Sequence, residues 1–128
     1  DRTLDRALIE AVVERVIDGE DAEIEYLGII LADHETVLQL NREYLEHDYT
    51  TDVLSFPLRE PGDGEKVVEG EIYVDLDTAA ERAPEFDATF EEEACRYTVH
   101  GLLHLLGYDD QSDEGRETMR ELEGRYLG

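Results

Sequence analysis

The chain has 128 residues, of which 35 are acidic and 11 basic, so its formal net charge at neutral pH is -24. That length suits one domain, residues 1–128, and no stretch reaches the roughly 18 apolar residues of a membrane span. One cysteine, Cys95, excludes an internal disulfide framework and a cysteine-based zinc cluster. The N-terminus lacks the basic and apolar run of a secretory signal, so we expect a cytoplasmic protein.

The acidic excess argues at first sight against a nucleic-acid partner, because phosphate binding normally rests on Lys and Arg. The acidic residues are spread over the whole chain, and Lys66 is the only lysine. Such a surface suits a very salty cytoplasm, where charge repulsion is screened within roughly 3 Å at molar salt. Under that hypothesis the charge does not exclude RNA.

The first part of the chain predicts a helix, a strand and a second helix. Apolar side chains recur at helical spacing over residues 4–17, with Thr3 placed to cap the helix. Residues 24–31 predict a strand that is apolar on both faces, as expected for a strand covered on both sides. Asp33 can then cap the next helix.

Residues 41–57 run from the end of that helix through a polar loop into a short strand. His47 in the loop is a candidate proton carrier or phosphate contact, and an ordinary surface histidine is the equal alternative. For Asp48, Thr51 and Asp52 we favour a local role, because such side chains commonly hold turns through backbone hydrogen bonds.

Residues 67–75 alternate imperfectly between apolar and polar side chains, which suits an antiparallel or edge strand with one wet face. Such an edge could hold an extended ligand. A short helix over 77–82 is predicted to end at Pro84. Thr89 and Glu92 then have the spacing of a capping box, which opens a longer helix.

The end of that longer helix has the spacing of a metal site. His100 and His104 are four residues apart, so both imidazoles lie on one helical face. Gly107 offers the left-handed position that ends a helix, after which the chain can return Asp110 to the same point. We prefer Asp110 to Asp109 as the third ligand. Imidazole and carboxylate suit zinc, or less selectively nickel, manganese or iron.

The residues on the other faces of this helix are predicted to pack in the protein core. Cys95 lies on the apolar stripe and is interpreted as a small core residue rather than a nucleophile. A last helix, from Ser112 through Tyr126, is predicted to pack behind the site. Metalloproteases of the HExxH type carry a glutamate base after the first histidine, and Gly101 stands there instead, which counts against a standard protease.

Two stretches together resemble one family. Residues 100–109 have the pattern His-Gly-x-Leu-His-Leu-x-Gly-Tyr-Asp and resemble the HGxLHLxGYDH motif of the YbeY family of bacterial metal-dependent endoribonucleases. Residues 51–57, preceded by Asn41, Tyr44 and Asp48, resemble the family's other marked stretch, and residues 70–73 look like its strand before the helices.

The resemblance implies zinc binding by His100 and His104, with His100 in the catalytic centre. Asp110 stands where the family usually has a third histidine, so it keeps a metal-binding side chain. The family's usual arginine after the tyrosine of the loop motif is Leu45 here. Arg42 or Arg59 could supply a cation instead.

Together these patterns predict an α+β, or mixed α/β, domain with a small mostly mixed sheet flanked by helices. The metal would lie in a cleft beside residues 44–56 and the strand at Gly70. The resemblance implies a single-strand-specific endoribonuclease in ribosomal RNA maturation and ribosome quality control, with ribosomal RNA and possible small-subunit proteins as partners. A zinc metalloprotease-like hydrolase and a non-catalytic ribosome-assembly factor are the alternatives.

Overall fold

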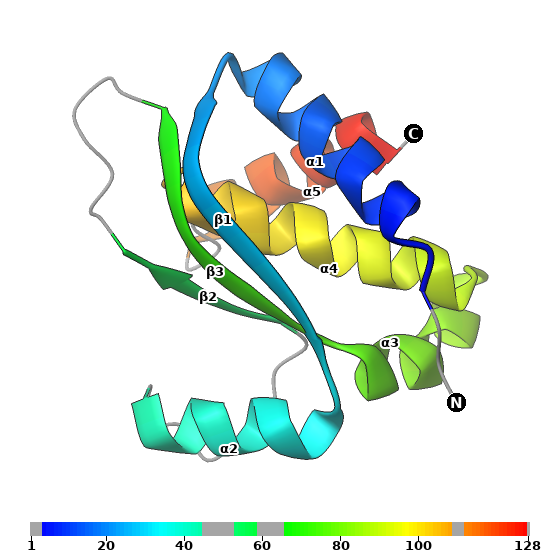
Figure 1. Cartoon of the computed structure of the whole chain (residues 1–128). Helices are drawn as coiled ribbons and strands as arrows, with labels where there is room; N and C mark the ends of the chain where they lie inside the picture. Colours follow the sequence, from blue (N-terminus) through cyan, green and yellow to red (C-terminus); the bar gives the residue numbers. More distant parts are fainter. Residues whose placement is uncertain (1–3, 45–52, 59–65, 109–111, 128) are drawn as a thin grey trace.

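A computed structural model of the chain describes residues 4–44, 53–58, 66–108 and 112–127 (Figure 1). These residues form helices on a three-stranded mixed sheet, which confirms the predicted α+β class. In chain order the elements are α1 (Arg6–Glu20), β1 (Glu23–Ala32), α2 (His34–Tyr44), β2 (Val53–Pro57), β3 (Val67–Asp75), α3 (Leu76–Arg82), the 3-10 turn η1 (Ala83–Phe86), α4 (Phe90–Leu105) and α5 (Asp113–Leu127).

The sheet has the strand order β1-β3-β2, so β3 is its central strand. It pairs in parallel with β1 and antiparallel with β2. The prediction of β3 as an antiparallel strand is confirmed by its pairing with β2, whereas the alternative of an edge strand open to an extended ligand was wrong. The predicted alternation is confirmed, because every second residue of β3 is buried, namely Val68, Gly70, Ile72 and Val74.

Strand β1 forms one edge of the described sheet, and none of its residues is fully buried. Its prediction as a strand covered on both faces was wrong. An apolar composition shows that a strand has a partner on at least one face, but it does not show which strand of the sheet lies in the middle. In β1 the apolar side chains Leu27, Ile29 and Leu31 are half-buried against the core.

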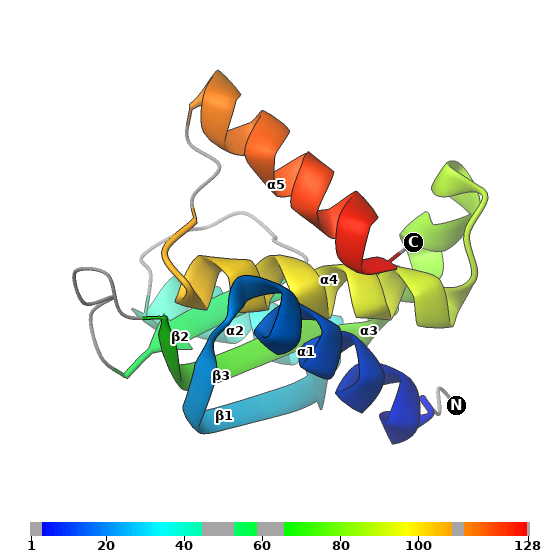
Figure 2. The same cartoon turned by 90° about the horizontal axis from the view of Figure 1, so that it is seen from above.

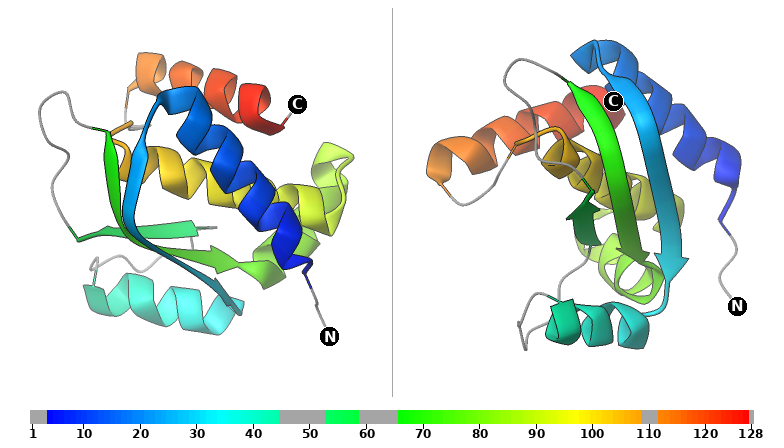
Figure 3. Two further views of the ribbon diagram at one scale, coloured as in Figure 1. Left: turned by 45° about the horizontal axis from the view of Figure 1, so that its top comes forward. Right: turned by 60° about the vertical axis from the view of Figure 1, so that its left-hand side comes forward.

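Helix α4 is the central helix, since it lies between the sheet and α5 (Figure 2). Helix α1 packs along α4, and α2 lies across the end of the sheet where β1 and β3 finish (Figure 3). The side chains of Val99, Leu102 and Leu103 on α4 are completely buried. Within the described residues, no helix is both long and apolar enough to cross a membrane.

Local hydrogen bonds explain where the first two helices begin. Asp5, rather than Thr3, caps α1, because its carboxylate accepts from Ala7 N at 3.0 Å. Thr3 itself lies outside the described residues, and α1 extends to Glu20, three residues beyond the predicted end. The predicted cap of α2 is confirmed, since Asp33 Oδ1 accepts from Thr36 N at 2.8 Å.

The predicted limits of α4 are confirmed in the same way. Thr89 Oγ1 accepts from Glu92 N at 3.1 Å, while the Glu92 carboxylate accepts from Thr89 N at 2.8 Å. After α4, Gly107 adopts φ 105°, and Tyr108 N donates to Leu103 O at 3.1 Å. This left-handed turn reverses the chain beside the two histidines.

Candidate metal centre at the end of α4

The imidazoles of His100 and His104 lie in a T-shaped arrangement on one face of α4. Their Nε2 atoms are 3.0 Å apart, and the ring centroids are separated by 4.6 Å at an interplanar angle of 76°. Both side chains are half-buried. The i and i+4 spacing thus brings together the two nitrogens that the sequence predicts as ligands.

The opposite nitrogen of each ring has a separate acceptor. His100 Nδ1 lies 2.7 Å from Glu123 Oε2, and His104 Nδ1 lies 3.0 Å from the Tyr108 carbonyl oxygen. A carbonyl and an ionised carboxylate can only accept, so each Nδ1 carries the proton. In the neutral rings both Nε2 atoms therefore carry lone pairs.

Two lone pairs directed at each other repel, whereas a cation placed between them is bound by both. Zinc has bonds to histidine of 2.0–2.1 Å and tetrahedral angles, which separate two ligand nitrogens by about 3.3 Å. The 3.0 Å between His100 and His104 is close to that separation. The donor chemistry therefore fits a divalent metal, and the partners on Nδ1 are those that metal-bound histidines commonly have.

Glu123 belongs to a buried ion-pair network between α4 and α5. Arg96 donates to both carboxylate oxygens of Glu93, at 2.8 and 2.6 Å, and to Glu123 Oε1 at 3.4 Å. Burial raises the pKa of Glu93, but the hydrogen bonds and charge of Arg96 outweigh it, so the pKa is lowered overall. Arg96 thus fixes one oxygen of Glu123 while the other faces His100.

A second network holds the carbonyl that accepts from His104. Tyr108 Oη donates to Glu20 Oε1 at 2.6 Å, and Lys66 Nζ lies 3.2 Å from the same oxygen. Tyr126 Oη donates to the other oxygen of Glu20. The bond to Glu20 raises the pKa of Tyr108 to about 12. The turn at Tyr108 is therefore anchored to α1 and, through Glu20, to Lys66 before β3 and to Tyr126 on α5.

Gly101 packs against the sheet. A Cβ atom at this position would lie 2.7 Å from Ile72 Cγ2 and 3.1 Å from both Ser55 Oγ and Val53 Cγ2. Ser55 Oγ also donates to the Gly101 carbonyl at 3.0 Å. The residue after the first histidine therefore faces β2 and β3, where a glutamate base could not be accommodated.

Cys95 is confirmed as a core residue, since only 7% of it is exposed. Burial raises the pKa of its thiol, which disfavours the reactive thiolate. The last predicted helix is also confirmed, because Met119, Leu122 and Tyr126 of α5 are buried and α5 packs on α4.

Several predicted site residues lie outside the described residues, namely Leu45, His47, Asp48, Thr51, Asp52, Arg59, Asp109 and Asp110. Asp110 as third ligand and His47 as catalytic residue stay predictions, as does the cleft beside residues 44–56. The described residues contain no group of three His, Cys, Asp or Glu side chains arranged to hold a metal. They supply two nitrogens, and the third ligand would have to come from elsewhere.

Sequence reasoning missed the two carboxylates that support the histidines. Glu123 and Glu20 are both buried, although each lies on an amphipathic helix among otherwise apolar buried positions. An acidic residue on the apolar face of a helix is a signal for a polar partner, because an unpaired buried charge is costly. That signal does not identify the partner, which lies 23 residues away for Glu123 and 88 residues away for Glu20.

A family model described as "Endoribonuclease YbeY" matches residues 1–128. The chain belongs to the YbeY family. The resemblance predicted from the two motifs is thereby confirmed, and with it a hydrolase that acts on RNA phosphodiester bonds. YbeY is a family of metal-dependent nucleases, so the predicted dependence on a metal is confirmed.

Individual YbeY proteins cover nearly all of this chain. "Endoribonuclease YbeY" of Salinibacter ruber is 54% identical over 131 residues, with 98% of this chain and 83% of that protein covered. "Endoribonuclease YbeY" of Chlorobium luteolum is 43% identical, with 98% and 89% covered. The solution structure of TM1509 from Thermotoga maritima matches with a TM-score of 0.66 and 34% identity, over 98% of this chain and 85% of that one.

Proposed function

We propose that this YbeY-family chain is a single-strand-specific, metal-dependent endoribonuclease that acts in ribosomal RNA maturation and ribosome quality control. Family membership supports the endoribonuclease activity. The observation that carries the proposal is the pair of Nε2 atoms of His100 and His104, 3.0 Å apart, with both Nδ1 protons held by acceptors. A site organised in this way favours a metal over a purely structural role for the histidines.

We propose zinc as the metal, with nickel or another divalent ion as the alternative. His100 and His104 would hold it, together with Asp110. Such an ion supplies a Lewis acid that polarises a phosphoryl oxygen and lowers the pKa of water toward ~7. A donor set of imidazole and carboxylate suits this group of ions.

The surrounding residues keep the two histidines in their metal-binding form. Glu123 holds the Nδ1 proton of His100 and strengthens Nε2 as a donor, and the Tyr108 carbonyl does the same for His104. His47 remains a candidate proton carrier or phosphate contact in the reaction. No described residue next to His100 on α4 offers a glutamate base, since Gly101 packs on the sheet.

A zinc metalloprotease-like hydrolase would share the proposed ligands but needs a base near the metal. The packing of Gly101 against Ile72 excludes that base at its usual position in the motif. A screen of the metal-loaded protein against a peptide library tests this alternative. We expect no peptide cleavage under conditions in which RNA is cut.

The decisive experiment is an RNA-cleavage assay at high salt, combined with metal analysis of untreated protein. We expect cleavage to vanish in His100→Ala and in Asp110→Ala, while Glu121→Gln on the exposed face of α5 retains it. Cleavage that persists in both variants would contradict the proposal. A protein that binds RNA but never cleaves it, with or without metal, would be the non-catalytic assembly factor.

The proposed substrate is single-stranded RNA, and the proposed partners are ribosomal RNA and proteins of the small ribosomal subunit in the cytoplasm. An oligonucleotide offered alone and then as a duplex with its complement tests strand specificity. We expect cleavage of the single strand only. Equal cleavage of both would contradict this part of the proposal.

A further inference from the structure

A second feature of the site is a cavity of about 210 Å³ between α4 and α5 that borders His100. A water molecule occupies about 30 Å³ of liquid, so the cavity has room for about seven waters. That is enough for a phosphate group and part of its hydration shell. The cavity is lined by Arg96, Tyr97, His100, Arg116, Met119, Arg120 and Glu123.

The lining concentrates positive charge in a strongly acidic protein. Among the described residues that line it, three of seven are arginines and one, Glu123, is acidic. The whole chain has 11 basic residues against 35 acidic ones. A cluster of three arginines beside His100 therefore runs against the charge of the rest of the molecule.

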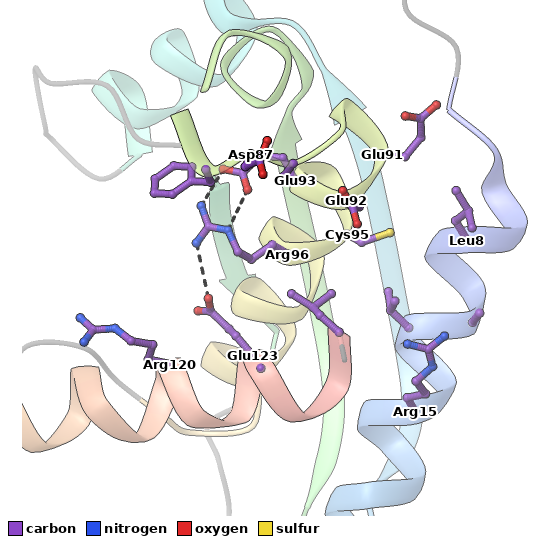
Figure 4. Close-up of a pocket in the computed structure, with 16 residues that line it drawn as sticks. Leu8, Arg15, Asp87, Glu91, Glu92, Glu93, Cys95, Arg96, Arg120 and Glu123 are labelled. Atoms are coloured by element: carbon purple, nitrogen blue, oxygen red, sulfur yellow. Dashed lines mark hydrogen bonds and ion pairs between the residues drawn. The ribbon is translucent and has the colours of Figure 1, made fainter. Parts of the chain in front are cut away.

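The three arginines are not equivalent. Arg96 is held by Glu93 and Glu123, as Figure 4 shows in the neighbouring larger cavity that shares this wall. Arg116 pairs with Asp113, whose side chain is fully exposed, and exposed pairs contribute little and exchange readily. Arg120 makes no hydrogen bond or ion pair within the described part of the chain, and no dashed line reaches it in Figure 4.

Arg116 and Arg120 lie four residues apart on α5, so their side chains share one face of the helix. Like charges at this spacing repel each other along a helix. An anion bound between them would relieve the repulsion. The guanidinium group is also the side chain that best matches the geometry of phosphate oxygens.

We propose that the cavity binds one phosphodiester group of the RNA strand, next to the phosphodiester group that is cleaved. Arg116 and Arg120 contact this neighbouring group. Arg96 is a positioning residue that keeps Glu123 directed at His100. This inference rests on the proposed function and adds the position of the RNA strand on the protein. The strand would run from the histidines into the groove between α4 and α5.

Binding of a nuclease-resistant, single-stranded 2′-O-methyl RNA oligonucleotide tests the site without cleavage. We expect Arg120→Gln and Arg116→Gln each to raise the dissociation constant about five- to tenfold. Each should also make the dependence of log affinity on log salt shallower by about 0.7. The matched control is Arg125→Gln, an exposed arginine of the same helix that does not line the cavity.

The control measures how far the loss of any one positive charge weakens RNA binding by a protein of net charge -24. Equal weakening in Arg125→Gln and Arg120→Gln would overturn the proposal. So would a variant that loses binding of inorganic phosphate but not of the oligonucleotide, because the cavity would then be a site for free phosphate. If cleavage depends on His100 but neither arginine affects binding, only this inference fails, and the proposed function stands.

Both arginines are exposed, so the variants should fold, and unchanged thermal unfolding midpoints verify this. Steady-state kinetics give an independent readout. We expect KM to rise with little change in kcat, since a flanking contact binds substrate and transition state alike. An unchanged KM with a lower kcat would contradict the assigned role.

Discussion

Glu123 Oε2 lies 2.7 Å from Nδ1 of His100, and this contact joins the C-terminal helix directly to the candidate metal centre. The other oxygen of the same carboxylate is held by Arg96. A side chain on α5 therefore holds Nδ1 of a histidine on α4 and so directs its Nε2 toward His104. The following predictions test this arrangement and the packing around it.

Replacing Glu123 by glutamine is expected to weaken metal binding at least tenfold. The amide oxygen can still accept a hydrogen bond from His100, but it lacks the negative charge that makes Nε2 a stronger electron-pair donor to the metal. The measurement is a competition titration with a chromophoric chelator. Glu121→Gln is the matched control, since Glu121 is an exposed neighbour on α5, and equal weakening in both would refute the role of Glu123.

Metal binding is expected to stabilise the fold. At a free zinc concentration 100 times the dissociation constant, the free energy of unfolding should rise by about 2.7 kcal/mol. The rise should disappear in His104→Ala and on adding a chelator. Thermal unfolding followed by circular dichroism measures it, and an identical rise in His104→Ala would show that the metal binds elsewhere.

Glu20→Gln is expected to destabilise the protein by about 2 kcal/mol at pH 7, because three donors lose a charged acceptor. Burial raises the pKa of Glu20, but its bonds from Tyr108, Tyr126 and Lys66 lower it overall below the usual 4.5. A lowered pKa means that the carboxylate contributes stability above about pH 4.5 and loses it as the pH falls through the folded value.

For Tyr108 the dependence of stability on pH has the opposite sign. Its raised pKa of about 12 contributes stability below pH 10, which is lost as the pH rises toward 12. The difference in urea unfolding free energy between wild type and Glu20→Gln should therefore be constant near neutrality and shrink at both extremes. A difference that does not depend on pH would contradict this network.

Two helical glycines should respond oppositely to alanine. In Gly101→Ala the new Cβ would lie 2.7 Å from Ile72 Cγ2, so overpacking should cost about 1–3 kcal/mol. In Gly124→Ala nothing lies within 4 Å, so helix propensity should stabilise the protein by up to about 1 kcal/mol. Urea unfolding of both variants measures this, and stabilisation of Gly101→Ala would disprove its close packing.

The net charge of -24 predicts stabilisation by salt. Screening of repulsion among acidic side chains should raise the thermal unfolding midpoint between low and molar potassium chloride. A chloride salt is chosen because sulfate also strengthens apolar burial. An unchanged midpoint would remove the hypothesis of adaptation to a salty cytoplasm.

The sequence alone determined what depends on neighbours along the chain. The cap at Thr89, the left-handed Gly107 and the pairing of His100 with His104 follow from spacings of three to four residues. Local geometry fixes such features whatever the rest of the molecule does. The two motifs of the chain also sufficed to identify the family.

Only the tertiary structure decided what depends on elements far apart in the chain. Strand β3 is central because β1 and β2 pair with its two edges, and alternation within β3 cannot show this. Glu123 reaches His100, and Glu20 reaches Tyr108 beside His104, because α5 and α1 both pack on α4. These contacts arise from burying apolar helix faces against each other, a non-directional force that a local sequence pattern does not encode.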